Sequence, residues 1–138
     1  MTVTLDHTIV HARDAGTTAR FMTEILGLPA PRTLGPFTVV RVGATSLDLM
    51  ETDQPIAPRH FAFLVGEAEF DAIFGRILAR RLPHWADPYK HEPGRINRWD
   101  DGRGVYFADP NGHLLEILTR PYGSGGAQAD NPNPLLGR

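Results

Sequence analysis

Three things that this chain lacks narrow what it can be. None of its 138 residues is a cysteine, which excludes disulfides, thiolate metal ligands and thiol nucleophiles. It has no run of about 20 apolar residues, the length that a membrane-spanning helix needs. Its 14 basic and 16 acidic residues leave a net charge of −2. The chain as a whole therefore has no positive electrostatic field that would attract nucleic acid or an anionic membrane. We therefore expect a small-molecule partner, and any metal ion must be held by His, Asp or Glu.

Length and composition predict one folded domain, which we place at residues 3–120. A chain of 138 residues, 41% of them hydrophobic, can bury one core but not two independent ones. The tail, residues 121–138, is rich in Gly, Pro and Asn, so we expect it to be mobile or to lie over a partner subunit. Residues 1–10 lack a basic leader and an apolar signal core, and we expect a cytoplasmic protein.

The order of the expected elements is the same in both halves of the domain. In the first half, about residues 3–53, we expect a strand, a helix that begins after Asp14 and ends at Gly27, and a hairpin. In the second half, about residues 58–120, we expect a strand, an amphipathic helix over Glu67–Arg81 and two further strands. The expected strands are Val3–Val10, Phe37–Val42, Ser46–Met50, Arg59–Val65, Val105–Ala108 and His113–Thr119. We assign Leu82–Gly104 to loops around a short strand or two.

Each half places one imidazole and one carboxylate at corresponding positions. His7 in the first strand corresponds to His60 in its repeat, and Asp48 corresponds to Glu116. Because strand side chains alternate, both acids point away from the face that their apolar neighbours pack. A charge in such a place is costly unless it is paired, protonated or bound to metal. Two imidazoles with one or two carboxylates suit a divalent ion of Fe, Mn, Co, Ni or Zn, although such a residue taken alone is more often exposed or hydrogen-bonded than a ligand.

The segment Gly104–Glu116, two strands around an Asp-Pro-Asn-Gly turn, resembles the signature hairpin of the vicinal oxygen chelate superfamily. This superfamily contains glyoxalases, ring-cleaving dioxygenases, and fosfomycin- and bleomycin-resistance proteins. The motifs Leu5-Asp-His-Thr-Ile-Val, Ile25-Leu-Gly-Leu-Pro and Arg59-His-Phe-Ala-Phe resemble its other landmarks, in the same order. The resemblance implies an α+β fold of tandem βαβββ modules that form a half-open, cup-shaped mixed sheet, usually in a homodimer.

The resemblance also implies residue roles. His7, His60 and Glu116 fall where the family's metal ligands fall, and the metal acts as a Lewis acid on a substrate held through adjacent oxygens. Asp48 lies where glyoxalase I enzymes have a fourth ligand, and we expect it to be that ligand, a base or a hydrogen-bond acceptor. Tyr106 lies where extradiol dioxygenases and fosfomycin transferases have a tyrosine that hydrogen-bonds the bound substrate, although a packed core position is the equal alternative.

Two departures from the family patterns weaken specific assignments. Ring-cleaving enzymes have an acid–base histidine shortly before that tyrosine, and here the stretch reads Ile96-Asn-Arg-Trp. Fosfomycin enzymes have threonine where this chain has Ile9. We expect Trp99, Arg98 and Arg103 in the loop region to contact substrate. The expected function is a metal-dependent enzyme of dioxygenase or glyoxalase type, and the alternative is a bleomycin-resistance-type protein that binds a small molecule without catalysis.

Overall fold

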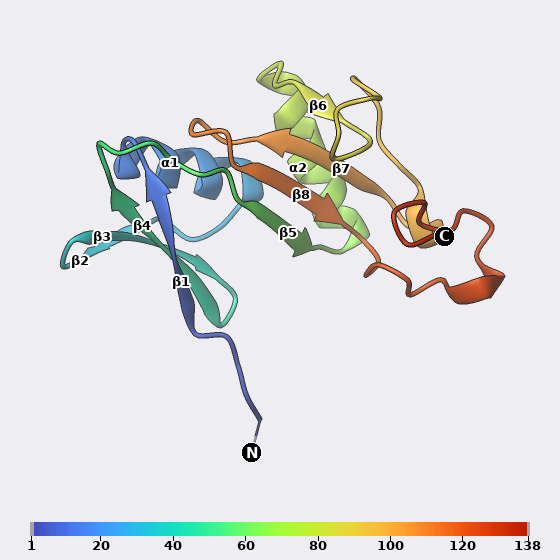
Figure 1. Ribbon diagram of the computed structural model, residues 1–138, viewed down its shortest axis with the longest axis horizontal. Coiled ribbons are helices and arrows are strands. Elements are labelled where there is room, and N and C mark those ends of the chain that lie inside the picture. Colours follow the sequence, from blue (N-terminus) through green and yellow to red (C-terminus); the bar gives the residue numbers. More distant parts are fainter. Residues whose placement is uncertain (1, 138) are drawn as a thin grey trace. The chain divides into compact units, whose positions relative to one another are not determined.

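The computed structural model describes residues 2–137, so Arg138 at the end of the predicted tail lies outside the described residues. It contains two βαβββ modules in tandem, each with a mixed, open four-stranded sheet and one helix, which confirms the predicted fold class (Figure 1). The chain divides into two compact units. Unit 1 is Met1–Pro58 with Asp109–Gly112, and unit 2 is Arg59–Ala108 with His113–Arg138.

Unit 1 contains five elements in the order β1 (His7–Ala12), α1 (Ala15–Leu26), β2 (Arg32–Leu34), β3 (Phe37–Val42) and β4 (Thr45–Glu51). Its sheet has the order β1-β4-β3-β2, with β1 parallel to β4 and the other pairs antiparallel. The carboxylate of Asp14 accepts a hydrogen bond from the Thr17 backbone at 2.8 Å, which satisfies a free N–H at the start of α1. Gly27 ends the helix with φ of 71°, a conformation that glycine adopts without strain.

The core of unit 1 lies between α1 and one face of its sheet. Fully buried apolar side chains fill this layer, among them Met22 and Ile25 of α1 and Val40 and Leu49 of the sheet. They alternate along the strands with residues of the opposite face. That opposite face is not covered by α1, and it carries exposed apolar side chains such as Leu34.

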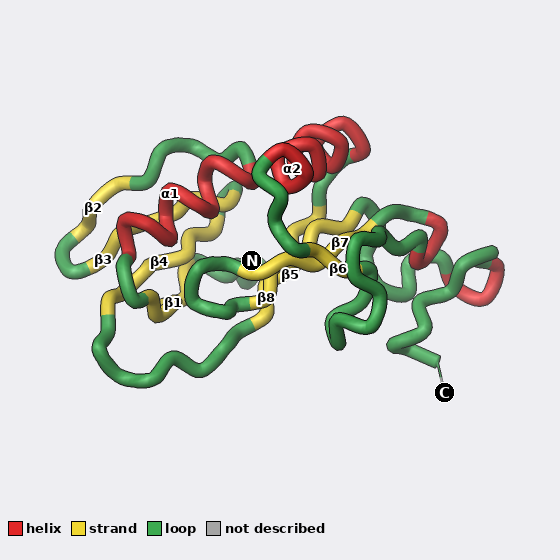
Figure 2. The backbone as a smooth tube through the Cα atoms, turned by 90° about the horizontal axis from the view of Figure 1, so that it is seen from above, coloured by secondary structure: helices red, strands yellow, loops and turns green. Residues whose placement is uncertain are grey.

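Unit 2 contains β5 (His60–Leu64), α2 (Glu67–Ala79), β6 (His84–Trp85), β7 (Gly104–Ala108) and β8 (Leu114–Leu118). Its sheet has the order β5-β8-β7-β6, with β5 parallel to β8. The tube in Figure 2 shows the long loop between β6 and β7 and the strand-free segment after β8. The core is formed by buried side chains of α2, β7 and β8: Phe70, Ile73, Ile77, Val105, Phe107, Leu115 and Ile117.

The main differences from the expected elements concern β2, the first strand and helix α2. Strand β2 was not expected from the sequence, because it has three exposed residues between Pro31 and Gly35 and no apolar alternation. The first strand begins at His7 rather than Val3. Helix α2 ends at Ala79, two residues before the expected end, and Arg81 has left-handed φ of 54°. The short strand expected within 82–104 is confirmed as β6. Among residues 2–137, no helix has both the length and the apolar character to cross a membrane.

Candidate metal centre

Strand register brings an imidazole and a carboxylate to the same face in each unit. In unit 1, His7 on β1 is paired with Ser46 on β4, two residues before Asp48. In unit 2, His60 on β5 is paired with Leu114 on β8, two residues before Glu116. Residues two apart along a strand point to the same side. The two pairs therefore occupy equivalent positions in the two modules.

In unit 2 the pair is in direct contact. The Nε2 atom of His60 lies 3.1 Å from Oε1 of Glu116, and its Nδ1 atom lies 3.0 Å from the carbonyl oxygen of Leu114. The Glu116 side chain is only 1% exposed, whereas that of His60 is 45% exposed. The hydrogen bond to Glu116 raises the pKa of His60, and the bond to Leu114 adds to this against the effect of burial. Both ring nitrogens thus face oxygen acceptors.

This contact fits two ligands of one divalent ion. Nitrogen and oxygen ligands lie about 2.0–2.2 Å from such an ion, so two of them at a right angle are about 3 Å apart. The Leu114 carbonyl holds Nδ1 of His60 and leaves Nε2 for an ion, as in most histidine metal sites. Within residues 2–137, however, no three His, Asp or Glu side chains are gathered closely enough to form a complete ligand set. His60 and Glu116 therefore fit two of the ligands of a metal ion, and they do not by themselves form a complete site.

Two tyrosines continue this cluster inside unit 2. Tyr106 on β7 is fully buried, is paired in register with Glu116 and stacks on the His60 ring with 5.8 Å between ring centroids. Its hydroxyl is hydrogen-bonded to that of Tyr122, which in turn lies 2.9 Å from both carboxylate oxygens of Glu116. Burial raises the pKa of both phenols, so at neutral pH they are uncharged hydrogen-bond donors.

Tyr122 was not among the residues expected from the sequence. It lies in the segment assigned to the tail, four residues after the end of β8, and no motif in that segment pointed to the site. The only signal was a large aromatic side chain in a stretch otherwise rich in glycine and proline. The structure brings it to Glu116 through the turn at Pro121, which local sequence patterns do not reveal.

The three expected substrate contacts have different surroundings. The ring of Trp99 packs edge-on against Tyr106 and Tyr122, with centroids 6.2 and 6.4 Å apart. Arg98 is exposed and lines a cavity of about 390 Å³. The role of both in substrate binding stays a prediction.

Arg103 is engaged by helix α2. Its guanidinium forms ion pairs with Glu67 at 2.7 Å and Asp71 at 2.8 Å, and it lies over the Phe70 ring at 4.4 Å from the centroid. The hydrogen bond to Asp71 raises the pKa of Arg103, and the bond to Glu67 adds to the effect. These contacts connect the residue before β7 to helix α2. The guanidinium that was expected to contact substrate is thus bonded to two acidic side chains of that helix.

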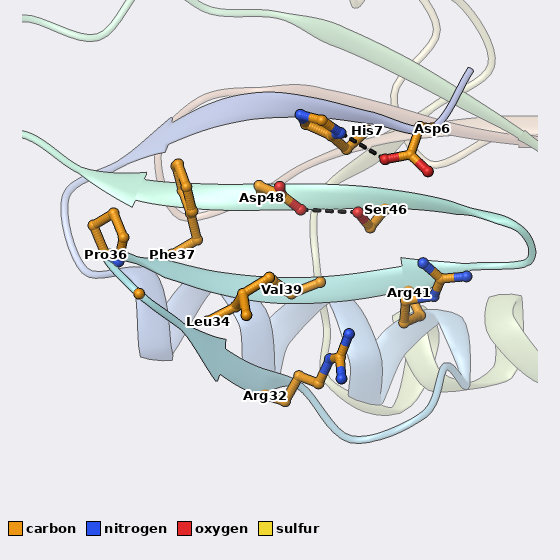
Figure 3. Close-up of a pocket in the computed structure, with 11 residues that line it drawn as sticks. Asp6, His7, Arg32, Leu34, Pro36, Phe37, Val39, Arg41, Ser46 and Asp48 are labelled. Carbon is orange, nitrogen blue, oxygen red and sulfur yellow. Dashed lines mark hydrogen bonds and ion pairs between the residues drawn. The ribbon is translucent and has the colours of Figure 1, made fainter. Parts of the chain in front are cut away.

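In unit 1 the counterpart pair is arranged differently. Asp48 is 7% exposed and accepts a hydrogen bond of 2.8 Å from the Ser46 hydroxyl, while Nδ1 of His7 bonds to Asp6 at 2.7 Å (Figure 3). The hydrogen bond to Asp6 raises the pKa of His7, and the charge of Asp48 adds to it. His7 and Asp48 therefore lie near each other without a direct bond.

These residues line a cavity of about 550 Å³ on the sheet face turned away from α1, as Figure 3 shows. Apolar side chains form part of its wall, and two guanidinium groups lie along β2 and β3. The lining residues are Asp6, His7, Arg32, Leu34, Gly35, Pro36, Phe37, Val39, Arg41, Ser46 and Asp48. Its size is in the range of cavities that hold small organic molecules.

Comparisons with known proteins identify close relatives over most of the chain. The family model of the Glyoxalase/Bleomycin resistance protein/Dioxygenase superfamily matches residues 4–117. The solved structure "Oxidase ChaP-H1" is 60% identical with a TM-score of 0.87, and the match covers 88% of this chain and 99% of that one. "Oxidase ChaP-H2" is 57% identical with a TM-score of 0.88, covering 91% of this chain and 100% of that one.

Further matches include a fosfomycin resistance protein and a metallothiol transferase. FosX from Mesorhizobium loti is 21% identical with a TM-score of 0.66, covering 88% of this chain and 95% of that one, and this likeness concerns the fold alone. Metallothiol transferase FosB from Shouchella clausii (strain KSM-K16) is 39% identical over 61 residues. That match covers 44% of this chain and 37% of the transferase, so it spans little more than a third of the relative's length.

Proposed function

This chain belongs to the Glyoxalase/Bleomycin resistance protein/Dioxygenase superfamily, and we propose that it is a metal-dependent enzyme that oxidises a small substrate held through two adjacent oxygens. The observation that carries the proposal is the contact of 3.1 Å between His60 and Glu116, which has the spacing of two ligands on one ion. The 60% identity to a protein named as an oxidase favours the dioxygenase type over the glyoxalase type.

In this proposal His60 and Glu116 hold a divalent ion of Fe, Mn, Co, Ni or Zn, with His7 as the third ligand. The ion supplies Lewis acidity to the substrate oxygens. Tyr106, an uncharged phenol beside both ligands, donates a hydrogen bond to bound substrate or acts as an acid. Asp48, buried and bonded to one hydroxyl, serves as a base or a fourth ligand.

The lining of the unit 1 cavity favours a flat substrate that carries oxygen atoms. The apolar part of its wall is formed by Leu34, Phe37 and Val39. The guanidinium groups of Arg32 and Arg41 can donate hydrogen bonds to anionic oxygens. An aromatic diol or a dicarbonyl compound combines an apolar body with adjacent oxygens. We propose this class of substrate, with Trp99, Arg98 and Arg103 as the further contacts expected from the sequence.

Oxygen uptake by the metal-loaded protein with a panel of catechols and aromatic diketones tests the proposal. We expect metal-dependent uptake that falls at least about 100-fold in Glu116→Gln. The matched control is Glu69→Gln, an exposed glutamate on α2, which should retain full activity. Isomerisation without oxygen uptake would instead point to a glyoxalase-type reaction.

The second candidate is a protein that binds a small molecule without converting it. The cavity of about 550 Å³ with its apolar wall favours it, because binding alone needs no metal ligands. Calorimetric binding of the same panel, followed by product analysis, separates the two candidates. Binding without product, in the presence of each metal, would support this second function and remove the first.

We further propose a homodimer. The sheet face of unit 1 that α1 leaves uncovered carries the exposed apolar side chains of Ile9, Leu34 and Met50. Exposed apolar surface of this kind is typical of protein interfaces or binding sites. Sedimentation velocity should give twice the mass of the 15.2 kDa chain, and a mass of one chain at micromolar concentration would contradict the dimer.

A further inference from the structure

The segment that follows β8, residues 121–137, lies against the candidate metal centre of unit 2, and we call it the strap. It carries Tyr122, whose hydroxyl lies 2.9 Å from both oxygens of Glu116. Apart from the short 3₁₀ turn Gly126–Gln128, the strap has no regular structure. Contacts to the rest of unit 2 must therefore hold it in place.

Two consecutive aspartates provide those contacts. The carboxylate of Asp100 accepts hydrogen bonds from the backbone of Gly123 at 2.9 Å and Gly125 at 3.1 Å. The carboxylate of Asp101 accepts them from the backbone of Asp130 at 3.1 Å and Asn131 at 2.8 Å. Four backbone N–H groups of the strap thus donate hydrogen bonds to the carboxylates of Asp100 and Asp101. We call these two residues the aspartate clamp.

The backbone of the clamp is itself unusual. Asp100 and Asp101 have φ of 56° and 61°, in the left-handed region that few residues other than glycine adopt. Such strain persists only when surrounding contacts compensate for it, and it concentrates at functional sites. The buried carboxylate of Asp100, 2% exposed, and its bonds to the strap supply that compensation.

The strap also packs closely on the clamp. A Cβ atom added to Gly125 would lie 2.7 Å from Cβ of Ala129 and 3.1 Å from Cα of Asp100, so only glycine fits there. A cavity that Asp100, Glu116 and Tyr122 help to line has a volume of about 10 Å³, room for about one water molecule. The clamp and the tyrosine therefore form one packed structure.

We propose that Tyr122 is a positioning residue of the metal centre and that the aspartate clamp holds it there. This proposal rests on the metal site of His60 and Glu116. An unrestrained carboxylate rotates about its last bond, whereas the Tyr122 hydroxyl, 2.9 Å from both oxygens of Glu116, restricts that rotation and would fix how the carboxylate faces an ion. Hydrogen bonds of this kind to a ligand typically change metal affinity by about 10–100-fold.

The first test is calorimetric titration with Mn²⁺ and with Zn²⁺ alone, using Tyr122→Phe and the matched control Tyr89→Phe. Tyr89 is a 68% exposed tyrosine of the same unit. We expect Tyr122→Phe to bind about 10-fold or more weakly and Tyr89→Phe to bind like the wild type. The visible spectrum of the Co²⁺-loaded protein should shift only in Tyr122→Phe. Unchanged or tighter binding by Tyr122→Phe would overturn the positioning role.

The second test removes the clamp without removing the tyrosine. Asp101→Gly keeps the left-handed backbone but loses the carboxylate, and Arg81→Gly is the control because Arg81 also has positive φ away from the strap. Hydrogen exchange of the metal-free protein should quicken in residues 121–137 only in Asp101→Gly. Its metal affinity should fall, and adding Tyr122→Phe should weaken it little further, since both changes act through one contact.

The outcomes separate the two proposals. If the wild type binds no ion, the metal site fails while the exchange experiment still tests the clamp. If the wild type binds an ion and Asp101→Gly releases the strap with no loss of affinity, the positioning role is overturned and the metal site stands. A strap that stays protected in Asp101→Gly overturns the clamp.

Discussion

The Nε2 atom of His60 lies 3.1 Å from Oε1 of Glu116, across the parallel strands β5 and β8. His7 and Asp48 occupy the same register positions in unit 1, yet they bond to other partners. Asp48 is one methylene shorter than a glutamate, and its carboxylate accepts a hydrogen bond from the Ser46 hydroxyl. The repeated module thus carries a ligand-spaced pair in one copy and a separated pair in the other.

Replacement of Arg103 by alanine should destabilise the protein, since the guanidinium joins β7 to α2 through Glu67 and Asp71. These acids are exposed, so screening limits the loss to about 1 kcal/mol, including the contact with the Phe70 ring. Urea denaturation measures it, with Arg98→Ala as the control that should keep wild-type stability. An unchanged KM in Arg103→Ala would remove this residue from the expected substrate contacts.

Docking of the strap should depend on pH through Asp101. Hydrogen bonds from the backbone of Asn131 and then Asp130 hold the pKa of Asp101 below its usual range, and the charge of Arg120 adds to the effect. A lowered folded-state pKa means that the stabilisation is present above the unfolded pKa of about 4 and is lost as pH falls through the folded value. The strap should therefore stay docked at neutral pH and loosen below about pH 4.

The fluorescence of Trp99 in a Trp85→Phe background follows this release, because Trp99 packs against Tyr122 and the chain has only two tryptophans. Asp101→Asn should abolish the dependence on pH in this range. Release near pH 6, or a response that Asp101→Asn leaves intact, would contradict the role of Asp101.

Leu115, fully buried on β8 beside Glu116, should be essential to stability. Leu115→Ala creates a cavity in the core and should cost about 2–5 kcal/mol in the free energy of unfolding. Leu64→Ala on β5, where the side chain is 63% exposed, should cost less than about 0.5 kcal/mol. Both should unfold in one transition if residues 3–120 form a single domain. Two separate transitions would contradict that prediction.

The arginines of the unit 1 cavity should act in substrate binding. Removal of the guanidinium in Arg41→Gln should raise KM for an acidic diol about 10-fold and leave kcat unchanged, since such contacts are equal in ground and transition state. The conservative Arg41→Lys should keep part of the effect by charge alone. Metal affinity should not change in either variant, and a parallel loss of metal would show that the substitution disturbs the site instead.

The sequence predicted the parts of this fold that depend on local patterns. The cap at Asp14, the end of α1 at Gly27 and the acid between apolar residues in β8 all have signals within a few positions. Strand β2 had none, because it is an exposed edge whose pairing with β3 decides its structure. Tyr122 and the two clamp aspartates also lacked a signal, since their contacts join residues more than 20 positions apart or cross a turn.

The most direct test of the central claim is the metal content of the protein purified without a histidine tag, measured beside His60→Ala and Glu116→Gln. Since both side chains are proposed ligands, the account predicts about one equivalent of a divalent transition metal in the wild type and almost none in either variant. Glu69→Gln should retain the full equivalent. A wild type that takes up no metal, even after incubation with each ion, or variants that keep it, would contradict the claim.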